Sequence, residues 1–207
     1  MATKNESGNL STLELASDNP FKRFSNWYDE AQKLGLKEPN AVCLATASKC
    51  GAPTSRMVLL KEFNENGFVI YTNLNSRKGK NVKENPQASL CFYWSDLGKQ
   101  IRIEGAVIKV SDEEADAYFS SRPFKSKVGA WASKQSEIME SRKDFLADIA
   151  KYTAKWAIGD VERPPHWTGI RIIPDYFEFC TDGRLDIPTR QVYKLIEESW
   201  YSGLLYP

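Results

Sequence analysis

The sequence predicts a mainly β protein with flanking helices, in which an antiparallel sheet or small barrel forms the body. Five runs of strand-like composition follow one another between residues 41 and 110. Turn-forming stretches such as 50–53, 64–67 and 96–98 separate them. Short strands at such close spacing are typical of antiparallel meanders and barrels. A chain of 207 residues with 42% apolar content is also long enough to form one well-packed domain.

The expected elements begin after a polar N-terminal segment. Residues 1–17 show no apolar period, so we expect a flexible arm there and a single domain over 18–207. Asp18 and Asn19 can cap a helix that Gly35 ends. The expected strands are 41–47, 55–63, 68–74, 88–94 and 100–110, with late strands at 168–174, 176–180 and 191–196 that complete the same barrel. Further helices are expected at 76–84, 111–120, 126–134 and 141–157.

Composition and charge limit the classes of function. The 28 basic and 27 acidic side chains leave a net charge of +1, which argues against a bulk electrostatic grip on nucleic acid or an anionic membrane. No apolar run is long enough to span a bilayer, and the N-terminus carries no signal segment. The four cysteines form no C-x-x-C pair, so we expect a reduced, cytoplasmic protein.

The chain contains a single histidine, His166. We therefore expect no metal site built on histidines, and Ser-His or Cys-His catalysis would depend on this one residue. His166 precedes a tryptophan in an apolar setting, which favours an ordinary structural role. If the protein is an enzyme, its chemistry is expected to come from a cofactor.

Three basic stretches could bind anions. Arg56 and Lys61 bracket an apolar strand, where charges ordinarily mark strand ends in solvent, and their odd separation places them on opposite faces of a regular strand. Residues 76–80, SRKGK, put cationic side chains at an expected helix start, where free N–H groups can bind a phosphate. A basic turn exposed to solvent would have the same composition. Tyr118 and Arg122 are four residues apart and can share one helix face, and Ser126 follows, so the three side chains could bind a phosphate together. In the alternative, Tyr118 packs in the core and Arg122 marks the end of a helix.

The order of these and other motifs resembles the pyridoxine/pyridoxamine 5′-phosphate oxidase family. The matching motifs are RMVLLK (56–61), YTN (71–73), SRKGK (76–80), NPQASLCFYW (85–94), QIRIEG (100–105), YFSSRP (118–123), SKVGAWASKQS (126–136) and HWTG (166–169). The resemblance covers the chain from about residue 18 to its end. It implies a split β-barrel that binds FMN at the interface of a homodimer. It also implies oxidation of pyridoxamine or pyridoxine 5′-phosphate to pyridoxal 5′-phosphate, with O2 as acceptor and H2O2 as product.

The same resemblance implies the site residues. Those that hold FMN are Arg56, Met57, Val58, Leu59, Leu60, Lys61, Tyr71, Thr72, Arg77, Lys78, Gln100, Gln135, Ser136 and Arg190, with Gln135 and Ser136 reaching across the dimer. Those that hold the substrate phosphate are Lys61, Tyr118, Arg122 and Ser126. Two phosphorylated ligands need two cationic clusters, and the basic stretches supply them.

The stretch 180–190, CTDGRLDIPTR, departs from the family pattern E-F-W-Q-G followed by R-L-H-D-R. Aligned without gaps, Cys180 replaces a flavin-contacting Trp, Asp186 a substrate-binding Arg, and Pro188 a His, while Arg190 matches. The family's Arg-Leu pair occurs two positions early, and a slip of the loop would let Arg184 take the catalytic place of the missing arginine. Loss of one guanidinium contact costs ~1.5–3 kcal/mol, roughly 10- to 150-fold in affinity or rate.

Three hypotheses follow. The first is an FMN-dependent oxidase of phosphorylated B6 vitamers. The second is a divergent paralogue that binds FMN or pyridoxal phosphate with weak or no turnover, or an oxidase with shifted substrate choice, because the changes fall on the substrate side. The third is a β-barrel that binds nucleic acid through its basic strands, against which stand the net charge and the lack of an RNA-binding aromatic motif.

Overall fold

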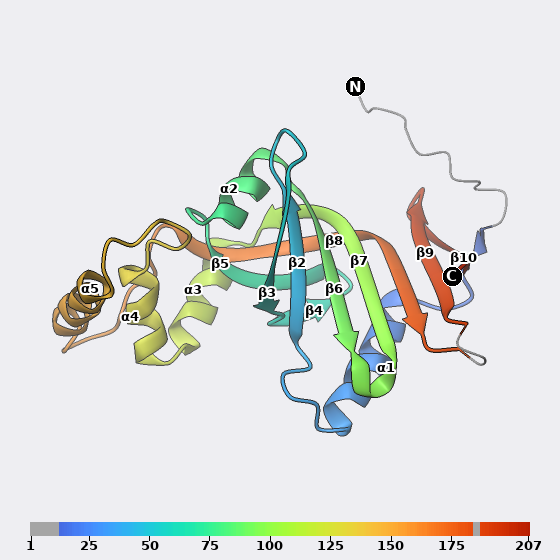
Figure 1. Ribbon diagram of the computed structural model, residues 1–207, viewed down its shortest axis with the longest axis horizontal. Coiled ribbons are helices and arrows are strands. Elements are labelled where there is room, and N and C mark those ends of the chain that lie inside the picture. Colours follow the sequence, from blue (N-terminus) through green and yellow to red (C-terminus); the bar gives the residue numbers. More distant parts are fainter. Residues whose placement is uncertain (1–12, 184–186) are drawn as a thin grey trace.

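The computed structural model describes residues 13–183 and 187–207 (Figure 1). Within these residues ten strands form one antiparallel sheet in the order β1-β10-β9-β8-β7-β6-β2-β3, and β5 pairs with β4 and β8. The expected fold class, mainly β with flanking helices, is confirmed. None of the described helices is long and apolar enough to cross a membrane.

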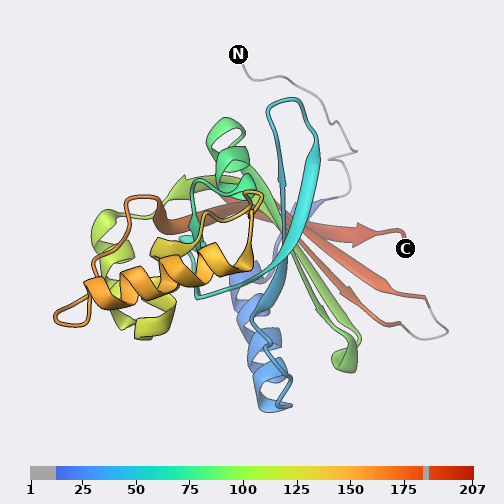
Figure 2. The ribbon, with the colours of Figure 1, turned by 60° about the vertical axis from the view of Figure 1, so that its left-hand side comes forward.

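The strands are β1 (Glu14–Leu15), β2 (Ala41–Ala47), β3 (Pro53–Leu59), β4 (Glu62–Asn64), β5 (Gly67–Asn73), β6 (Gln87–Trp94), β7 (Lys99–Lys109), β8 (Trp167–Thr181), β9 (Thr189–Ile196) and β10 (Ser199–Leu205). The helices are α1 (Pro20–Lys33), α2 (Arg77–Glu84), α3 (Asp112–Ser121), α4 (Phe124–Ala132) and α5 (Arg142–Lys155), and a 3-10 turn, η2 (Ser95–Leu97), joins β6 to β7. Figure 2 shows α5 alongside α4, at the end of the molecule away from β9 and β10.

Strand β8 runs through the centre of the sheet and changes partners along its length. Its first half pairs with β5, its second half pairs with β9, and β7 follows the opposite edge throughout. The register shifts between Glu104 and Gly105, so that Pro174 lies at a bulge, where its missing N–H breaks no ladder. The two late strands expected at 168–174 and 176–180 are therefore one strand.

Helix α1 covers the inner face of the sheet. Asn19 accepts hydrogen bonds from the N–H groups of residues 21 and 22 and caps the helix, and Gly35 follows its end at a φ of 74°. Phe24 is fully buried and packs edge-on against Phe68 and Phe92, with ring centroids 4.9 and 5.2 Å away. This aromatic cluster fixes α1 against the sheet, as the helical spacing predicts.

Three further boundaries differ from the sequence expectation. The run expected as one strand over 55–63 divides into β3 and β4, because the Leu60 N–H bonds to the Asn40 carbonyl and the Lys61 N–H to the Val69 carbonyl. Strand β10 was not expected, since its sequence, SWYSGLL, shows only weak alternation of apolar and polar residues. The segment expected as an arm over 1–17 includes β1, whose two residues pair with the edge of β10.

Candidate active site

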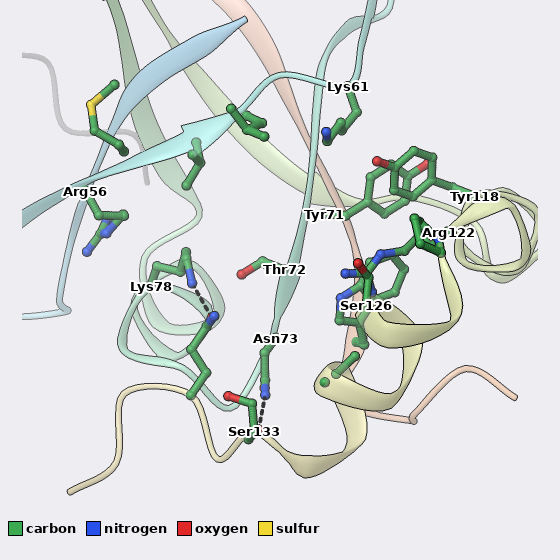
Figure 3. A pocket seen from close by; sticks show the side chains of 18 of the residues that line it. Arg56, Lys61, Tyr71, Thr72, Asn73, Lys78, Tyr118, Arg122, Ser126 and Ser133 are labelled. Atoms are coloured by element: carbon green, nitrogen blue, oxygen red, sulfur yellow. Dashed lines mark hydrogen bonds between the residues drawn. The ribbon is translucent and has the colours of Figure 1, made fainter. Parts of the chain in front are cut away.

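A cavity of about 790 Å³ lies between the strands β3 and β5 and the helices α2, α3 and α4 (Figure 3). This volume suits a small molecule. Four of the described lining residues carry positive charge, namely Arg56, Lys61, Lys78 and Arg122. The described lining contains no aspartate or glutamate. The cavity therefore has the charge of an anion-binding site.

Arg56 and Lys61 reach the same cavity, which follows β3 and the residues after it. Both residues line it (Figure 3), although a regular strand would place them on opposite faces. Consecutive residues of both parities, 56–59, line the cavity, so it runs along β3, the last strand in the sheet order, and receives side chains from both faces. Leu60 points into the core instead, with 4% of its surface exposed.

Neutral side chains hold Arg56 in place. Its guanidinium donates to the hydroxyl oxygens of Thr46 and Thr54, and the side chain of Asn81 on α2 donates to both hydroxyls at 3.1 Å. Burial, followed by the charge of Arg77, lowers the pKa of Arg56. Its charge is thus positioned without being neutralised by these partners.

Lys78 lies near Arg56 and also lacks an acidic partner among the described residues. Its ammonium donates to Ser76 Oγ at 3.1 Å and to Gln135 Oε1 at 2.6 Å. Burial, followed by the charge of Arg56, lowers the pKa of Lys78 to about 8. A bound anion would reverse this shift, because it favours the charged ammonium.

Asn73 joins the end of β5 to the segment after α4. Its side-chain nitrogen donates to the Ser133 carbonyl at 3.3 Å (Figure 3), and its Oδ1 accepts from the Asn75 N–H at 2.8 Å. This link holds the segment that carries Gln135 beside α2. Gln135 thereby reaches Lys78 of its own chain, and its expected contact with FMN across a dimer stays a prediction.

A stack of aromatic rings forms the opposite wall. The rings of Tyr71, Tyr118 and Trp167 are nearly parallel, with interplanar angles of 1° to 9°. The ring centroid of Tyr71 lies 3.9 Å from that of Tyr118 and 5.2 Å from that of Trp167, and the latter two are 6.2 Å apart. Burial raises the pKa of Tyr71 to about 12, with the charge of Glu114 as the second cause. Tyr71 is therefore a neutral hydroxyl at physiological pH.

Arg122 lies against this wall. Its guanidinium carbon is 4.7 Å from the ring centroid of Trp167, and burial lowers the pKa of the guanidinium. Arg122 Nη1 and the hydroxyl oxygen of Thr72 on β5 are buried polar atoms without a hydrogen-bond partner in the described structure. Buried polar groups ordinarily have partners, and two of the four described side-chain atoms that lack one belong to residues of the cavity lining; the other two belong to Thr168 and Arg171, outside it.

Most of the predicted site residues line this one cavity. They are Arg56, Met57, Val58, Leu59, Lys61, Tyr71, Thr72, Lys78, Tyr118, Arg122, Ser126 and Gln135. Leu60, Arg77, Gln100, Ser136 and Arg190 are not part of its lining, and Arg184 lies outside the described residues. The prediction did not name seven further lining residues, Asn73, Ser121, Pro123, Gly129, Ala130, Ser133 and Trp167. All seven lie within the motifs YTN, YFSSRP, SKVGAWASKQS and HWTG, so these motifs were the signal that could have found them.

Arg190 belongs to a separate charge cluster on β7, β8 and β9. Its Nε donates to Glu178 at 2.8 Å, and Arg102 and the Tyr176 hydroxyl donate to the same carboxylate at 3.1 and 3.0 Å. Glu178 is only 2% exposed. Burial raises its pKa, but the hydrogen bonds from Arg190 and Tyr176 and the charge of Arg102 outweigh this effect and lower it.

His166 has a structural setting. Its Nε2 lies 3.1 Å from the Ala130 carbonyl oxygen, its ring meets Trp131 edge-on, and it does not line the cavity. The described residues hold no cluster of three or more metal-ligating side chains.

Sequence comparison connects this site with known proteins. The profile of the pyridoxamine 5′-phosphate oxidase family matches residues 28–156, more than half of the chain. The pyridoxine/pyridoxamine 5′-phosphate oxidase of Pelagibacter ubique is 47% identical over 209 residues that cover 100% of both chains. The protein of the same name from Brucella canis is 48% identical over 193 residues, which cover 92% of this chain and 95% of that one.

Solved structures share the fold. PhzG from Burkholderia lata, in complex with tetrahydrophenazine-1-carboxylic acid, is 28% identical, with a TM-score of 0.87 over 91% of this chain and 93% of its own. An FMN-binding protein of Nostoc punctiforme related to pyridoxamine 5′-phosphate oxidase is 18% identical, with a TM-score of 0.73 over 92% of this chain and 99% of its own. The second likeness bears on the fold alone.

Proposed function

The chain belongs to the pyridoxamine 5′-phosphate oxidase family, and on this premise we propose that it oxidises pyridoxamine and pyridoxine 5′-phosphates to pyridoxal 5′-phosphate. FMN is the cofactor, O2 is the electron acceptor and H2O2 is the second product. The observation that carries the proposal is the cavity with four cationic side chains and no acidic one among its described lining residues. Two phosphorylated ligands supply the negative charge that such a lining requires.

The residues at one end of the cavity fit FMN. Arg56 and Lys78 carry charge that no carboxylate in the described structure neutralises, which suits the cofactor phosphate. Met57, Val58 and Leu59 offer an apolar strand edge for a flat ring, and Thr72 Oγ1 is free to bond to the ligand. When bound, FMN supplies the redox chemistry, as acceptor of a hydride and donor of electrons to O2.

The residues at the other end fit the phosphate of the substrate. Lys61, Tyr118, Arg122 and Ser126 all line this part, and they supply two charges and two hydroxyl groups (Figure 3). Arg122 has a free buried N–H donor there. These residues orient the substrate and hold it by its phosphate, and the aromatic wall of Tyr71 and Tyr118 excludes water from one side.

Because FMN would supply the redox chemistry, the protein's own side chains need only bind and orient the substrate and the cofactor. The site can therefore work although the chain's one histidine lies outside it, and the site offers few groups that carry protons. The altered stretch 180–190 weakens binding of the part of the substrate that lies away from its phosphate. We propose that Arg184 compensates in part for the family's arginine, which Asp186 replaces. Turnover then falls below that of relatives with the full motif, without being abolished.

We also propose that the active form is a homodimer. By strand register, Met57, Tyr93, Gln100 and Arg190 lie on one face of the sheet, opposite the face that α1 covers. Met57 and Tyr93 are 65% and 68% exposed there. Gln100 and Arg190 are predicted FMN contacts outside the cavity of their own chain, so a second copy packed on this face would bring them to the cofactor.

Mass measurement in solution tests this assembly. Light scattering should give twice the chain mass, and Tyr93→Glu should shift it to one chain mass and weaken FMN binding. A wild-type monomer that binds FMN tightly would contradict the dimer.

We propose that the protein is located in the cytoplasm, in line with its four free thiols, at Cys43, Cys50, Cys91 and Cys180.

The activity is tested by supplying purified, FMN-loaded protein with each phosphorylated vitamer and measuring pyridoxal 5′-phosphate and H2O2. Arg122→Met should lower kcat/KM by roughly 10- to 150-fold, because it removes a charged hydrogen-bond donor. Arg142→Met, at the exposed start of α5 and outside the cavity lining, is the matched control and should leave it unchanged. Flavin-loaded protein that forms no product from either vitamer would refute the proposed activity.

A further inference from the structure

Trp167 lies in the wall of the cavity and has no role in the function proposed above. We infer that Trp167 is a positioning residue, which holds the guanidinium of Arg122 against its ring face and so sets the affinity for the phosphorylated end of the substrate. The inference rests on the proposed function, which assigns Arg122 to that phosphate. Its test is therefore chosen so that the two can fail separately.

Arg122 is partly buried and packs against two aromatic rings. Its guanidinium carbon lies 4.7 Å from the indole centroid of Trp167 and 5.6 Å from the ring centroid of Phe119. Trp167 is only 6% exposed and Phe119 1%. A cation over an aromatic face is stabilised most when both groups are removed from water.

The indole ring is itself held from several sides. It stacks on Tyr71 of β5 and meets Phe119 of α3 edge-on at 5.0 Å and 69°. The backbone carbonyl of Trp167 accepts a hydrogen bond from Arg163 Nη1 at 2.9 Å. Arg163 in turn pairs with Asp112 and Asp116 of α3, the helix whose C-cap residue is Arg122. The ring and the cation it supports are therefore fixed to one another.

The chemistry of this support matters for binding. A carboxylate beside Arg122 would hold the guanidinium but would also neutralise it and occupy its N–H donors. An indole face attracts the charge and accepts no N–H···O bond, so Nη1 stays buried without a partner. An arginine side chain loses rotamer freedom when a ligand fixes it, and restricting it before the ligand arrives lowers the cost of binding. Trp167 thus provides a preorganised cation with free donors.

The experiment measures the dissociation constants of pyridoxal 5′-phosphate and of pyridoxal, which lacks the phosphate, on FMN-loaded protein. Trp167→Leu should weaken binding of the phosphorylated ligand by about 5- to 30-fold, the range of a desolvated cation–π contact. Binding of pyridoxal should change much less. Trp131→Leu is the matched control, because Trp131 belongs to the same apolar cluster but packs on Tyr152 and Trp156, away from Arg122.

A double-mutant cycle with Arg122→Met separates positioning from general damage. If Trp167 acts through Arg122, adding Trp167→Leu to Arg122→Met should cost less than about twofold further. Should Trp167→Leu fail to fold, the same cycle with Trp167→Phe decides, with a loss of about 2- to 5-fold that vanishes in the Arg122→Met background.

Three results would overturn the inference: additive losses in the cycle, equal losses for both ligands, or no loss at all. Failure of the proposed function has a different signature. In that case the wild-type protein would not prefer the phosphorylated vitamer over pyridoxal, whatever the variants do.

Discussion

The affinity for FMN should fall as the pH rises through the pKa of Lys78. Burial, with the charge of Arg56 as the second cause, lowers this pKa to about 8 in the ligand-free protein. A phosphate bound beside the ammonium favours its charged form and raises the pKa again. Binding above pH 8 must therefore take up a proton, so the affinity is complete below the lowered pKa and is lost as the pH rises above it.

The size of the effect follows from the proton equilibrium. With a pKa of about 8, roughly nine tenths of Lys78 is charged at pH 7 and roughly one tenth at pH 9. The dissociation constant for FMN should therefore rise about tenfold between these two values. The phosphate itself does not contribute, because its second ionisation, near pH 6, is already complete.

The assay is titration of FMN into the apoprotein by flavin fluorescence at pH 7, 8 and 9 and constant ionic strength. Lys78→Met should bind roughly 10- to 150-fold more weakly at pH 7 and show a flat profile. Lys80→Met, an exposed lysine on the same helix that does not line the cavity, should keep the tenfold change. A flat wild-type profile, or a tenfold change that persists in Lys78→Met, would refute the reasoning.

Four other substitutions have defined outcomes. Glu178→Gln should lower the free energy of unfolding by about 1–3 kcal/mol at pH 7 in urea denaturation. Because the pKa of Glu178 is lowered, its contribution is complete above the ordinary value of 4.5, and the gap to wild type should close as the pH falls through the folded-state pKa. Gly105→Ala would place a Cβ 1.9 Å from the Ile173 carbonyl oxygen and should cost about 1–3 kcal/mol. Gly129→Ala, with nothing within 4 Å, should change stability by less than about 1 kcal/mol in the same assay. Ser126→Ala should raise KM for the phosphorylated vitamers by about 2- to 10-fold with kcat unchanged, measured by steady-state kinetics.

The sequence determined much of the local structure, because the signals are short-range. Asn19 caps α1 and Gly35 follows its end, and the predicted strand over 41–47 is β2 without change. Ser111 accepts from the Glu114 N–H at 3.1 Å, as the capping motif before α3 predicts. Such features depend on residues within one turn of each other, which a single sequence displays directly. The order of the motifs also predicted the family.

Only the tertiary structure decided how these pieces meet. The parity of a regular strand separates Arg56 from Lys61, and the cavity that runs along β3 receives both. A bulge opposite Gly105 lets β8 run past Pro174, which local propensity treats as a break. Trp167 reaches Arg122 because β8 and α3 pack together, although the two residues lie far apart in the chain. Contacts of this kind depend on packing between distant segments, and neither spacing nor composition encodes that packing locally.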